Sequence, residues 1–325
     1  MPRIALITLT VVVALVFVAC GDKKSGDPTG PGGGDPPPVV YVVGYNYGTG
    51  AYATAACWKD GVPQTLPGAV SDNSWAYGIA VSDDSVYISS YNDDTAAYWK
   101  DGVLQTITGA AIGDSYAYAI AVSGSDVYIA GVNNNTAVYW ENGALKTLTD
   151  AASGSYTRAI AVSGDSVYVA GKNNNTAAYW EDGEPQTLDG AASGSYANDI
   201  AVSGDSIYVA GTNNGTAVYW LNGEPKTITE AASGNSSARG ITVSGSDVYI
   251  AGVNNNTAVY WLNGDLKTLT GAAGGSYAEA IAVYGGSVYV AGINNSKAAY
   301  WKDGVPQTID TVIQSWAYAI AVVDK

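Results

Sequence analysis

Seven tryptophans recur along the chain at an almost constant interval: Trp58, Trp99, Trp140, Trp180, Trp220, Trp261 and Trp301. The successive spacings are 41, 41, 40, 40, 41 and 40 residues. Self-similarity at a fixed period of this size is the sequence signature of a repeat architecture, in which copies of one small unit share a continuous core. The fold must therefore be built from seven copies of a unit of about 40 residues.

Each repeat contains four short segments with the properties of β-strands. In the repeat around Trp180 these segments are residues 156–163, 166–170, 176–180 and 184–188. Asp182-Gly183 is a strong signal for a type I′ hairpin, and Pro185 restricts the last segment to a sheet edge. No segment has a helical period, and four antiparallel strands form one propeller blade. The sequence therefore predicts an all-β, seven-bladed β-propeller.

The two ends of the chain are complementary. The first repeat begins at Val39 and lacks an innermost strand, whereas residues 315–322 supply an innermost strand with no repeat after it. Pairing of this C-terminal strand with the first repeat would complete one blade from both ends. An open stack of repeats would need capping units, and neither end of the array resembles one. We therefore expect a closed ring of four-stranded blades.

The repeat unit reads Ala-Ile-Ala-Val-Ser-Gly at residues 159–164, Val-Tyr-Val-Ala-Gly at 167–171, Ala-Tyr-Trp at 178–180 and Asp-Gly at 182–183. Over residues 39–325 the chain resembles bacterial repeat-type lipoproteins that fold as seven-bladed β-propellers. The resemblance implies the fold but no particular function, because such repeats are specific for the fold alone.

The N-terminus has the composition of an export signal. Residues 4–19 form an apolar run of 16 residues, which is short for a membrane span. The segment Phe17-Val18-Ala19-Cys20 resembles a bacterial lipobox, although Phe17 stands where Leu is usual. We therefore expect residues 1–20 to be a lipoprotein signal peptide and Cys20 to be the lipid-modified residue. The alternatives are an ordinary secretory signal and an uncleaved anchor.

Residues 21–38 are rich in Gly and Pro and almost free of apolar side chains. A linker of this length has a mean reach of about 25 Å and would hold a folded domain away from a membrane surface. Gly21 stands after Cys20, where Asp would be the common signal for retention at the inner membrane. We expect the protein in the bacterial cell envelope, held to the outer membrane or cell surface by its lipid anchor alone.

The composition excludes several functions. The 325 residues include no histidine, which excludes Ser-His-Asp and Cys-His catalysis, histidine-bound metals and histidine proton shuttles. The formal net charge is −15, from 14 Lys and Arg against 29 Asp and Glu. Such a charge argues against nucleic acid as a partner. We also expect no metal, no cofactor and a monomeric propeller.

Residues that recur at the same place in every repeat are expected to be structural. The Tyr-Trp pair is interpreted as packing between blades rather than as a sugar platform. The Asn runs, such as Asn173–Asn175, are interpreted as left-handed turns between the second and third strands. Cys57 replaces the tyrosine of the Tyr-Trp pair, and we expect it to be a buried, inert thiol.

One position near the start of each innermost strand varies while its neighbours do not. Its occupants are Tyr77, Tyr118, Arg158, Asn198, Arg239, Glu279 and Tyr318. The position two residues earlier is occupied by Trp75, Tyr116, Tyr156, Tyr196, Ser237, Tyr277 and Trp316. A spacing of two places both on one side of a strand. Since the innermost strand lines the channel, we expect both positions at one channel mouth.

In ring order these residues separate into two arcs. Three adjacent blades supply an aromatic arc of Trp75, Tyr77, Tyr116, Tyr118, Trp316 and Tyr318. The other blades supply a polar arc of Arg158, Asn198, Asp199, Arg239 and Glu279. Residues 45–52, a long connection, and Tyr91 are expected beside the aromatic arc. Concave sites with aromatic walls and a few polar groups are the usual ligand sites, so the two arcs form the candidate binding site.

Three functions remain open. The first is a non-catalytic recognition module that holds a glycan or a peptide at the channel mouth. The second is a structural or adhesion scaffold that contacts another envelope protein through its outer rim. The third is a propeller hydrolase or lyase that uses Asp199 and Glu279, because two carboxylates can run glycoside chemistry. Neighbouring arginines should depress both pKa values, which disfavours a general acid. We therefore prefer the first function and expect no catalytic residue.

Overall fold

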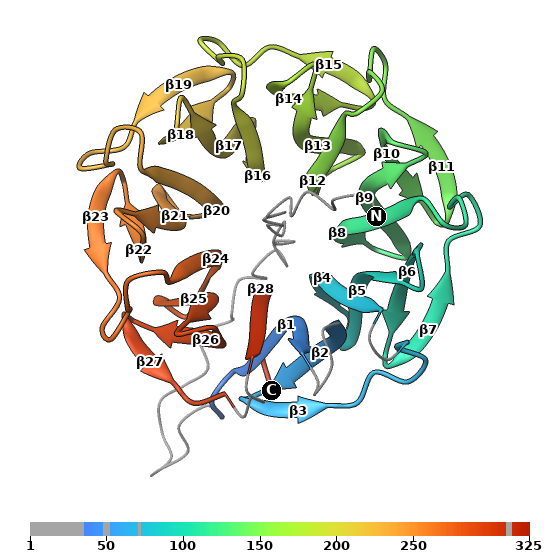
Figure 1. Ribbon diagram of the computed structural model, residues 1–325, viewed down its shortest axis with the longest axis horizontal. Helices are drawn as coiled ribbons and strands as arrows, with labels where there is room; N and C mark the ends of the chain where they lie inside the picture. The colour runs from blue at the N-terminus through green and yellow to red at the C-terminus, as the bar shows by residue number, and fades with distance from the viewer. Residues whose placement is uncertain (1–35, 48–52, 71–72, 310–313) are drawn as a thin grey trace, which may run out of the picture.

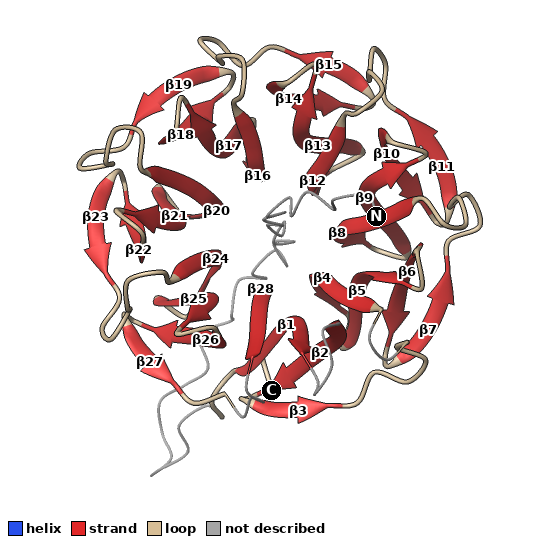
Figure 2. Ribbon diagram, viewed as in Figure 1, coloured by secondary structure: helices blue, strands red, loops and turns tan. Residues whose placement is uncertain are grey.

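The computed structural model describes residues 36–47, 53–70, 73–309 and 314–325. Its strands form seven four-stranded antiparallel sheets, which are arranged as blades in a ring (Figure 1). Every element of the described residues is a strand, turn or loop, and none is a helix (Figure 2). The prediction of an all-β, seven-bladed propeller is confirmed. Cys20, the rest of the predicted signal peptide and most of the tether lie outside the described residues.

Four concentric rings of strands make up the propeller. The innermost strands are β28 (Gln314–Val323), β4 (Ser74–Ser82), β8 (Ser115–Ser123), β12 (Tyr156–Ser163), β16 (Tyr196–Ser203), β20 (Ser236–Ser244) and β24 (Tyr277–Tyr284). The second strands are β1 (Val39–Tyr47), β5 (Ser85–Asn92), β9 (Asp126–Asn133), β13 (Ser166–Asn173), β17 (Ser206–Asn213), β21 (Asp247–Asn254) and β25 (Ser287–Asn294). The third strands are β2 (Ala53–Lys59), β6 (Thr95–Lys100), β10 (Thr136–Glu141), β14 (Thr176–Glu181), β18 (Thr216–Leu221), β22 (Thr257–Leu262) and β26 (Lys297–Lys302). The outermost strands are β3 (Val62–Gln64), β7 (Val103–Thr106), β11 (Ala144–Thr147), β15 (Glu184–Gln186), β19 (Glu224–Thr227), β23 (Asp265–Thr268) and β27 (Val305–Gln307).

The ring is closed by strand pairing between the two ends of the chain. β28 pairs antiparallel with β1 from Val39↔Val323 to Tyr47↔Gln314, and this sheet has the order β28-β1-β2-β3. Each innermost strand also packs against its two neighbours, so that β28 contacts both β24 and β4. The expected closure by the C-terminal strand is therefore confirmed.

The recurring tryptophans pack one blade against the next. All seven are fully buried. Among the residues that the structure describes, four of them also donate an indole N–H to a backbone carbonyl of the preceding blade, as Trp180 does to Thr149 at 3.0 Å. The other three hydrogen bonds of this kind join Trp99 to Pro67, Trp220 to Asp189 and Trp301 to Thr270. The interpretation of these residues as packing is confirmed, and their role explains why they do not vary.

A buried serine at the start of each innermost strand provides a second repeated bond between blades, which the sequence analysis missed. Its hydroxyl oxygen accepts the backbone N–H of an alanine on the third strand of the preceding blade, at 2.8–3.0 Å. The pairs are Ser74–Ala55, Ser115–Ala96, Ser155–Ala137, Ser195–Ala177, Ser236–Ala217, Ser276–Ala258 and Ser315–Ala298. A Ser-aromatic pair in six of the seven repeats, with Ser236-Ser237 in the other, was the available signal.

The turns follow from local chemistry. Asp182 and Gly183 both have positive φ values, 51° and 85°, as a type I′ hairpin requires. Asn174 and Asn175 are likewise left-handed, at 47° and 62°, which confirms the Asn runs as turns. Cys57 is a free, buried thiol, and burial raises its pKa to about 12. This agrees with the prediction of an inert cysteine.

Every innermost strand contains one β-bulge, which the sequence analysis did not predict. In β12 Thr157 pairs with Gly171 and Ala159 pairs with Ala170, so Arg158 between them has no partner in the ladder. The same register shift occurs in the other six innermost strands. In each case the extra residue is the variable position. A bulge leaves its extra residue unpaired and redirects that side chain, so pairing in the ladder does not restrict which residue occupies this position.

We expect that Gly171→Ala destabilises the propeller by about 1–3 kcal/mol or more, as overpacking of a closed structure does. A Cβ at Gly171 would lie 2.0 Å from the backbone oxygen of Tyr156, which the bulge brings against the second strand. Gly274→Ala is the matched control, because nothing lies within 4 Å of a Cβ there. Denaturant unfolding of both variants measures the difference. Equal midpoints for the two variants would contradict the close approach.

Candidate functional site

The seven bulge residues meet inside the channel and form what we call the channel belt: Tyr77, Tyr118, Arg158, Asn198, Arg239, Glu279 and Tyr318. Six of them are less than 9% exposed, and Arg239 is partly exposed. The tyrosine rings contact one another across blades, with centroids 5.2 Å apart for Tyr77 and Tyr118 and 5.6 Å apart for Tyr77 and Tyr318. The variable positions are therefore brought together, one from each blade.

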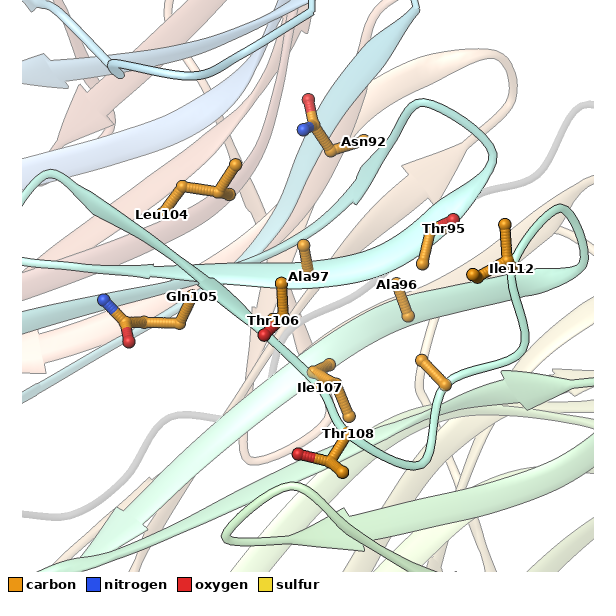
Figure 3. Close-up of a pocket in the computed structure, with 11 residues that line it drawn as sticks. Asn92, Thr95, Ala96, Ala97, Leu104, Gln105, Thr106, Ile107, Thr108 and Ile112 are labelled. Atoms are coloured by element: carbon orange, nitrogen blue, oxygen red, sulfur yellow. The ribbon is translucent and has the colours of Figure 1, made fainter.

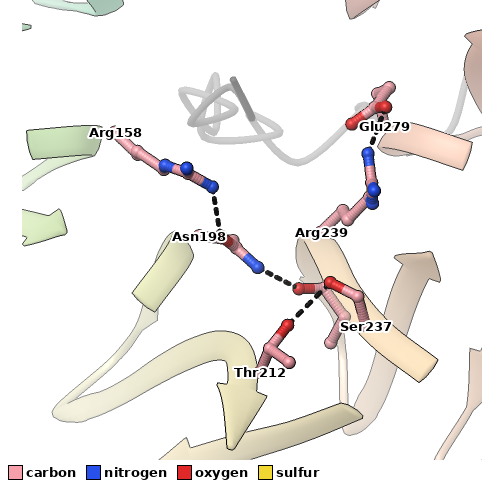
Figure 4. Close-up of polar contacts among 7 residues, drawn as sticks. Arg158, Asn198, Thr212, Ser237, Arg239 and Glu279 are labelled. Atoms are coloured by element: carbon pink, nitrogen blue, oxygen red, sulfur yellow. Dashed lines mark hydrogen bonds and ion pairs between the residues drawn. The ribbon is translucent and has the colours of Figure 1, made fainter. Parts of the chain in front are cut away.

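The polar half of the belt is a series of contacts between neighbouring blades. Arg158 donates from Nη1 to Asn198 Oδ1 at 2.7 Å, and Asn198 donates from Nδ2 to the carbonyl of Ala238 at 2.8 Å. Arg239 forms an ion pair with Glu279 through Oε1. Figure 4 shows these side chains extending from neighbouring innermost strands toward the channel. The pairing of adjacent charges between blades partly neutralises the belt.

The residues two positions before the bulges form a second layer, which we call the rim: Trp75, Tyr116, Tyr156, Tyr196, Ser237, Tyr277 and Trp316. All seven are partly exposed. Rim rings cover the belt guanidinium groups: Arg158 lies 5.0 Å from the ring centroid of Tyr156, and Arg239 lies 4.7 Å from that of Tyr277. Cation–π contacts of this kind hold the arginine side chains in place.

Ser237 is the one rim residue without an aromatic ring. Its hydroxyl lies 2.7 Å from that of Thr212 on β17, the second strand of the preceding blade (Figure 4). Because serine is smaller than Trp or Tyr, the rim covers the belt least beside Arg239, which follows two residues later on β20. Arg239 is also the one belt residue that is not buried.

The aromatic half packs largely on itself. Tyr45 is stacked on Trp316 with centroids 5.1 Å apart, and Tyr91 is stacked on Tyr116 at 4.6 Å. Tyr45 and Tyr91 thus lie beside the aromatic arc, whereas residues 48–52 of the long connection lie outside the described residues. Because many of these ring faces are occupied by other rings, only the outward faces of the partly exposed rim residues are open to a ligand.

Asp199 does not belong to the channel site, which corrects our expectation for the polar arc. Its side chain is 1% exposed, and its two carboxylate oxygens accept the backbone N–H groups of Ile200 at 2.9 Å and Ile241 at 2.8 Å. Ile241 lies on the next blade, so the carboxylate joins two adjacent innermost strands. The bulge is the reason: Asp199 comes directly after the bulge residue and faces the neighbouring blade, where the other repeats have Gly or Ala.

Burial, rather than the nearby arginines, dominates the titration of the two carboxyls. Desolvation raises the pKa of Glu279, although Arg239 and, more weakly, Arg158 act to lower it. Desolvation also raises the pKa of Asp199 well above its ordinary value, against two backbone hydrogen bonds that lower it. Our expectation that neighbouring arginines would depress both pKa values was wrong, because it ignored the cost of burying a charge.

Three polar atoms of the belt have no hydrogen-bond partner among the described residues: Arg158 Nε, Arg239 Nε and Glu279 Oε2. Buried polar groups in folded proteins are almost always paired. Two donors and one acceptor of the belt are therefore unpaired, besides four buried side-chain atoms elsewhere in the described part of the chain.

A separate cavity of about 350 Å³ lies at the outer side of the blade formed by β4–β7 (Figure 3). It is lined by β6, β7 and the connection after β7, including Ile112, which is 92% exposed. No belt or rim residue lines it, and its lining carries no charged side chain. The cavity is independent of the channel and is lined by a mixture of apolar and uncharged polar side chains.

No cluster of three or more Cys, Asp or Glu side chains suited to a metal ion occurs in the part of the chain that the structure describes. Within the same ranges, no helix has the length and apolar character needed to cross a bilayer.

The sequence matches no protein-family model and no curated protein. Its fold is similar to two solved Bacteroides structures, both provisionally named 6-phosphogluconolactonase. The protein from Bacteroides uniformis gives a TM-score of 0.53 at 16% identity, over 88% of this chain and 99% of that one. The protein from Bacteroides fragilis gives 0.52 at 13% identity, over 91% of this chain and 100% of that one. Similarity at such low identity shows the fold alone.

The buried carboxyl of Asp199 predicts a pH dependence of stability. Its folded-state pKa lies above the ordinary value of 3.8, so the folded protein keeps a proton that the unfolded chain has released. Relative to Asp199→Ala, which restores the residue type of the other blades, the wild-type protein should be most stable below pH 3.8 and lose stability as the pH rises toward the raised pKa.

Urea unfolding of both proteins across this pH range tests the prediction, with Asp205→Ala on an exposed turn as the control. A wild-type protein that gains stability over Asp199→Ala with rising pH would show that the two backbone hydrogen bonds outweigh desolvation.

Proposed function

We propose that this protein is an exported, lipid-anchored recognition module that binds a glycan at the channel mouth without chemical turnover. One observation carries the proposal. All seven innermost strands share the same bulge, yet the bulge residues differ and leave three polar atoms of the belt unpaired. Blade packing alone would need one residue type repeated seven times, as it does for the buried tryptophans.

The rim supports a glycan as the ligand. Six of its seven residues are Trp or Tyr, and all are partly exposed. Aromatic rings bury large apolar areas with little loss of side-chain freedom, and their faces suit the C–H surfaces of sugar rings. The belt beneath offers hydrogen-bonding groups for sugar hydroxyls. A peptide ligand in the same mouth is the competing possibility.

The polar side chains favour binding over catalysis. The oxygens of Asp199 are engaged by backbone groups on two blades, and Glu279 is held in an ion pair with Arg239. Neither carboxyl is therefore free to act as a mobile acid or base in the channel. The lactonase name belongs to the two Bacteroides proteins. Turnover of 6-phosphogluconolactone by this chain, lost in Glu279→Gln, would favour an enzyme instead.

Anchoring is proposed from the sequence. The apolar run, the lipobox-like segment ending at Cys20 and the Gly/Pro-rich tether together support export and lipid attachment. A tether reach of about 25 Å would leave the channel mouth accessible above the membrane surface.

A glycan array probed with the full chain should give binding that Trp75→Ala weakens about tenfold, which corresponds to ~1.4 kcal/mol. Trp75 is a partly exposed rim residue whose ring also contacts Tyr91 at 5.1 Å. Tyr208→Ala, which truncates a partly exposed aromatic residue on β17, is the matched control and should bind normally. Binding to peptides alone would show that the ligand is a peptide rather than a glycan. If Trp75→Ala still captured an envelope protein, the scaffold function would be favoured instead.

Cells that express the protein in the presence of a labelled fatty acid should attach the label and hold the protein in the membrane fraction. Cys20→Ala should abolish both, because Cys20 is the proposed attachment site. Cys57→Ala removes the other cysteine, which is buried, and should keep both. An unlabelled wild-type protein in the soluble fraction would refute lipid anchoring.

A further inference from the structure

We propose that the glycan is recognised through an acidic sugar, whose carboxylate binds between Arg158 and Arg239 while an adjacent hydroxyl donates to Glu279. This inference rests on the proposed function and assigns a ligand class to the same mouth. It follows from the polarity of the unpaired belt atoms, the charge of the belt and the position of Ser237, the rim residue without an aromatic ring.

The unpaired atoms define which groups a ligand must carry. Arg158 Nε and Arg239 Nε are hydrogen-bond donors without a partner among the described residues, and Glu279 Oε2 is an acceptor without one. Arg158 is 6% exposed and Glu279 is 2% exposed, so bulk water does not readily satisfy these atoms. A matching ligand must therefore present acceptors to the two guanidinium groups and a donor to the carboxylate.

The charge of the belt selects an anion. The belt contains two arginines and one glutamate, so it carries one positive charge in excess. A neutral sugar would leave that excess unpaired, whereas a simple inorganic anion would place a further acceptor against Glu279 Oε2. A carboxylate next to a hydroxyl fits both requirements, because arginine pairs well with carboxylates and the hydroxyl can donate to Glu279.

The rim indicates where the sugar enters. Ser237, the one rim residue without a ring, stands between Tyr196 on β16 and Tyr277 on β24, the strands on either side of β20. Its side chain is short and its hydroxyl already pairs with that of Thr212, so this part of the rim is polar and has no aromatic ring. A sugar ring placed here would lie between Tyr196, whose ring Lys172 already faces at 4.0 Å, and Tyr277, whose ring Arg239 faces at 4.7 Å, with Arg239 and Glu279 below. A free amino acid such as glycine also carries a carboxylate but lacks the sugar ring that would lie at the rim.

The test is calorimetric titration of the full chain with D-glucuronate, its methyl ester, D-glucose and glycine. Glucuronate should bind at least tenfold more tightly than the ester and glucose, because only its carboxylate can satisfy the arginines. Arg158→Gln should weaken glucuronate binding at least tenfold, and Lys226→Gln on the outer strand β19 should leave it unchanged.

The wild-type comparison between glucuronate and its ester keeps the proposal testable even if Arg158→Gln fails to fold. Equal binding of glucuronate, its ester and glucose would overturn the inference that the ligand is an acidic sugar. The proposal of glycan recognition would not be affected by that result. Tighter binding of glycine than of glucuronate would overturn the sugar in favour of an amino acid. A chain that binds none of these probes and no glycan on an array would refute both this inference and the proposed function.

Discussion

The antiparallel pairing of β28 with β1 is the interaction on which the rest of the structure depends. It joins the two ends of the chain in one sheet without a covalent bond, so that each innermost strand has a neighbour on both sides. Tyr318 and Tyr77 are bulge residues far apart in sequence. Only in a closed ring can their side chains contact each other, with ring centroids 5.6 Å apart. The belt therefore exists only because the ring is closed.

Within the ring, structural and variable roles are assigned to different residues of the same repeat. A buried serine and a buried tryptophan make the same contacts between blades in successive repeats, as Ser195 does with Ala177 and Trp180 with Thr149. The bulge residue takes part in neither contact and is unpaired in the ladder. Seven nearly identical blades can therefore present four different residue types, Tyr, Arg, Asn and Glu, to one channel without a change in these contacts. This separation of roles is what makes a repeat protein suited to recognition.

The aromatic and polar sides of the belt and rim differ in how completely their side chains are already paired or stacked. The tyrosines and tryptophans on one side are largely satisfied by stacking on one another, as Tyr45 is on Trp316. On the other side Arg158, Arg239 and Glu279 pair only in part, and each retains one unpaired polar atom among the described residues. Burial raises the pKa of Glu279 despite its arginine partner, which shows how strongly this region is desolvated. A bound ligand would therefore form more new hydrogen bonds with the polar half than with the aromatic half.

The sequence by itself determined the number of blades, the turns and the closing strand, because tryptophan spacing, Asp-Gly pairs and strand alternation are local or periodic signals. It also identified the variable positions, since repeats within one chain can be compared directly. It could not reveal the bulges, because a bulge changes the ladder register between two strands and leaves the sequence of either strand ordinary. That register decided that Arg158 and Glu279 face the channel whereas Asp199, next to a bulge, is buried between blades and bonded to Ile241. Burial, in turn, set the direction of both carboxyl pKa shifts, and burial is a property of the assembled ring alone.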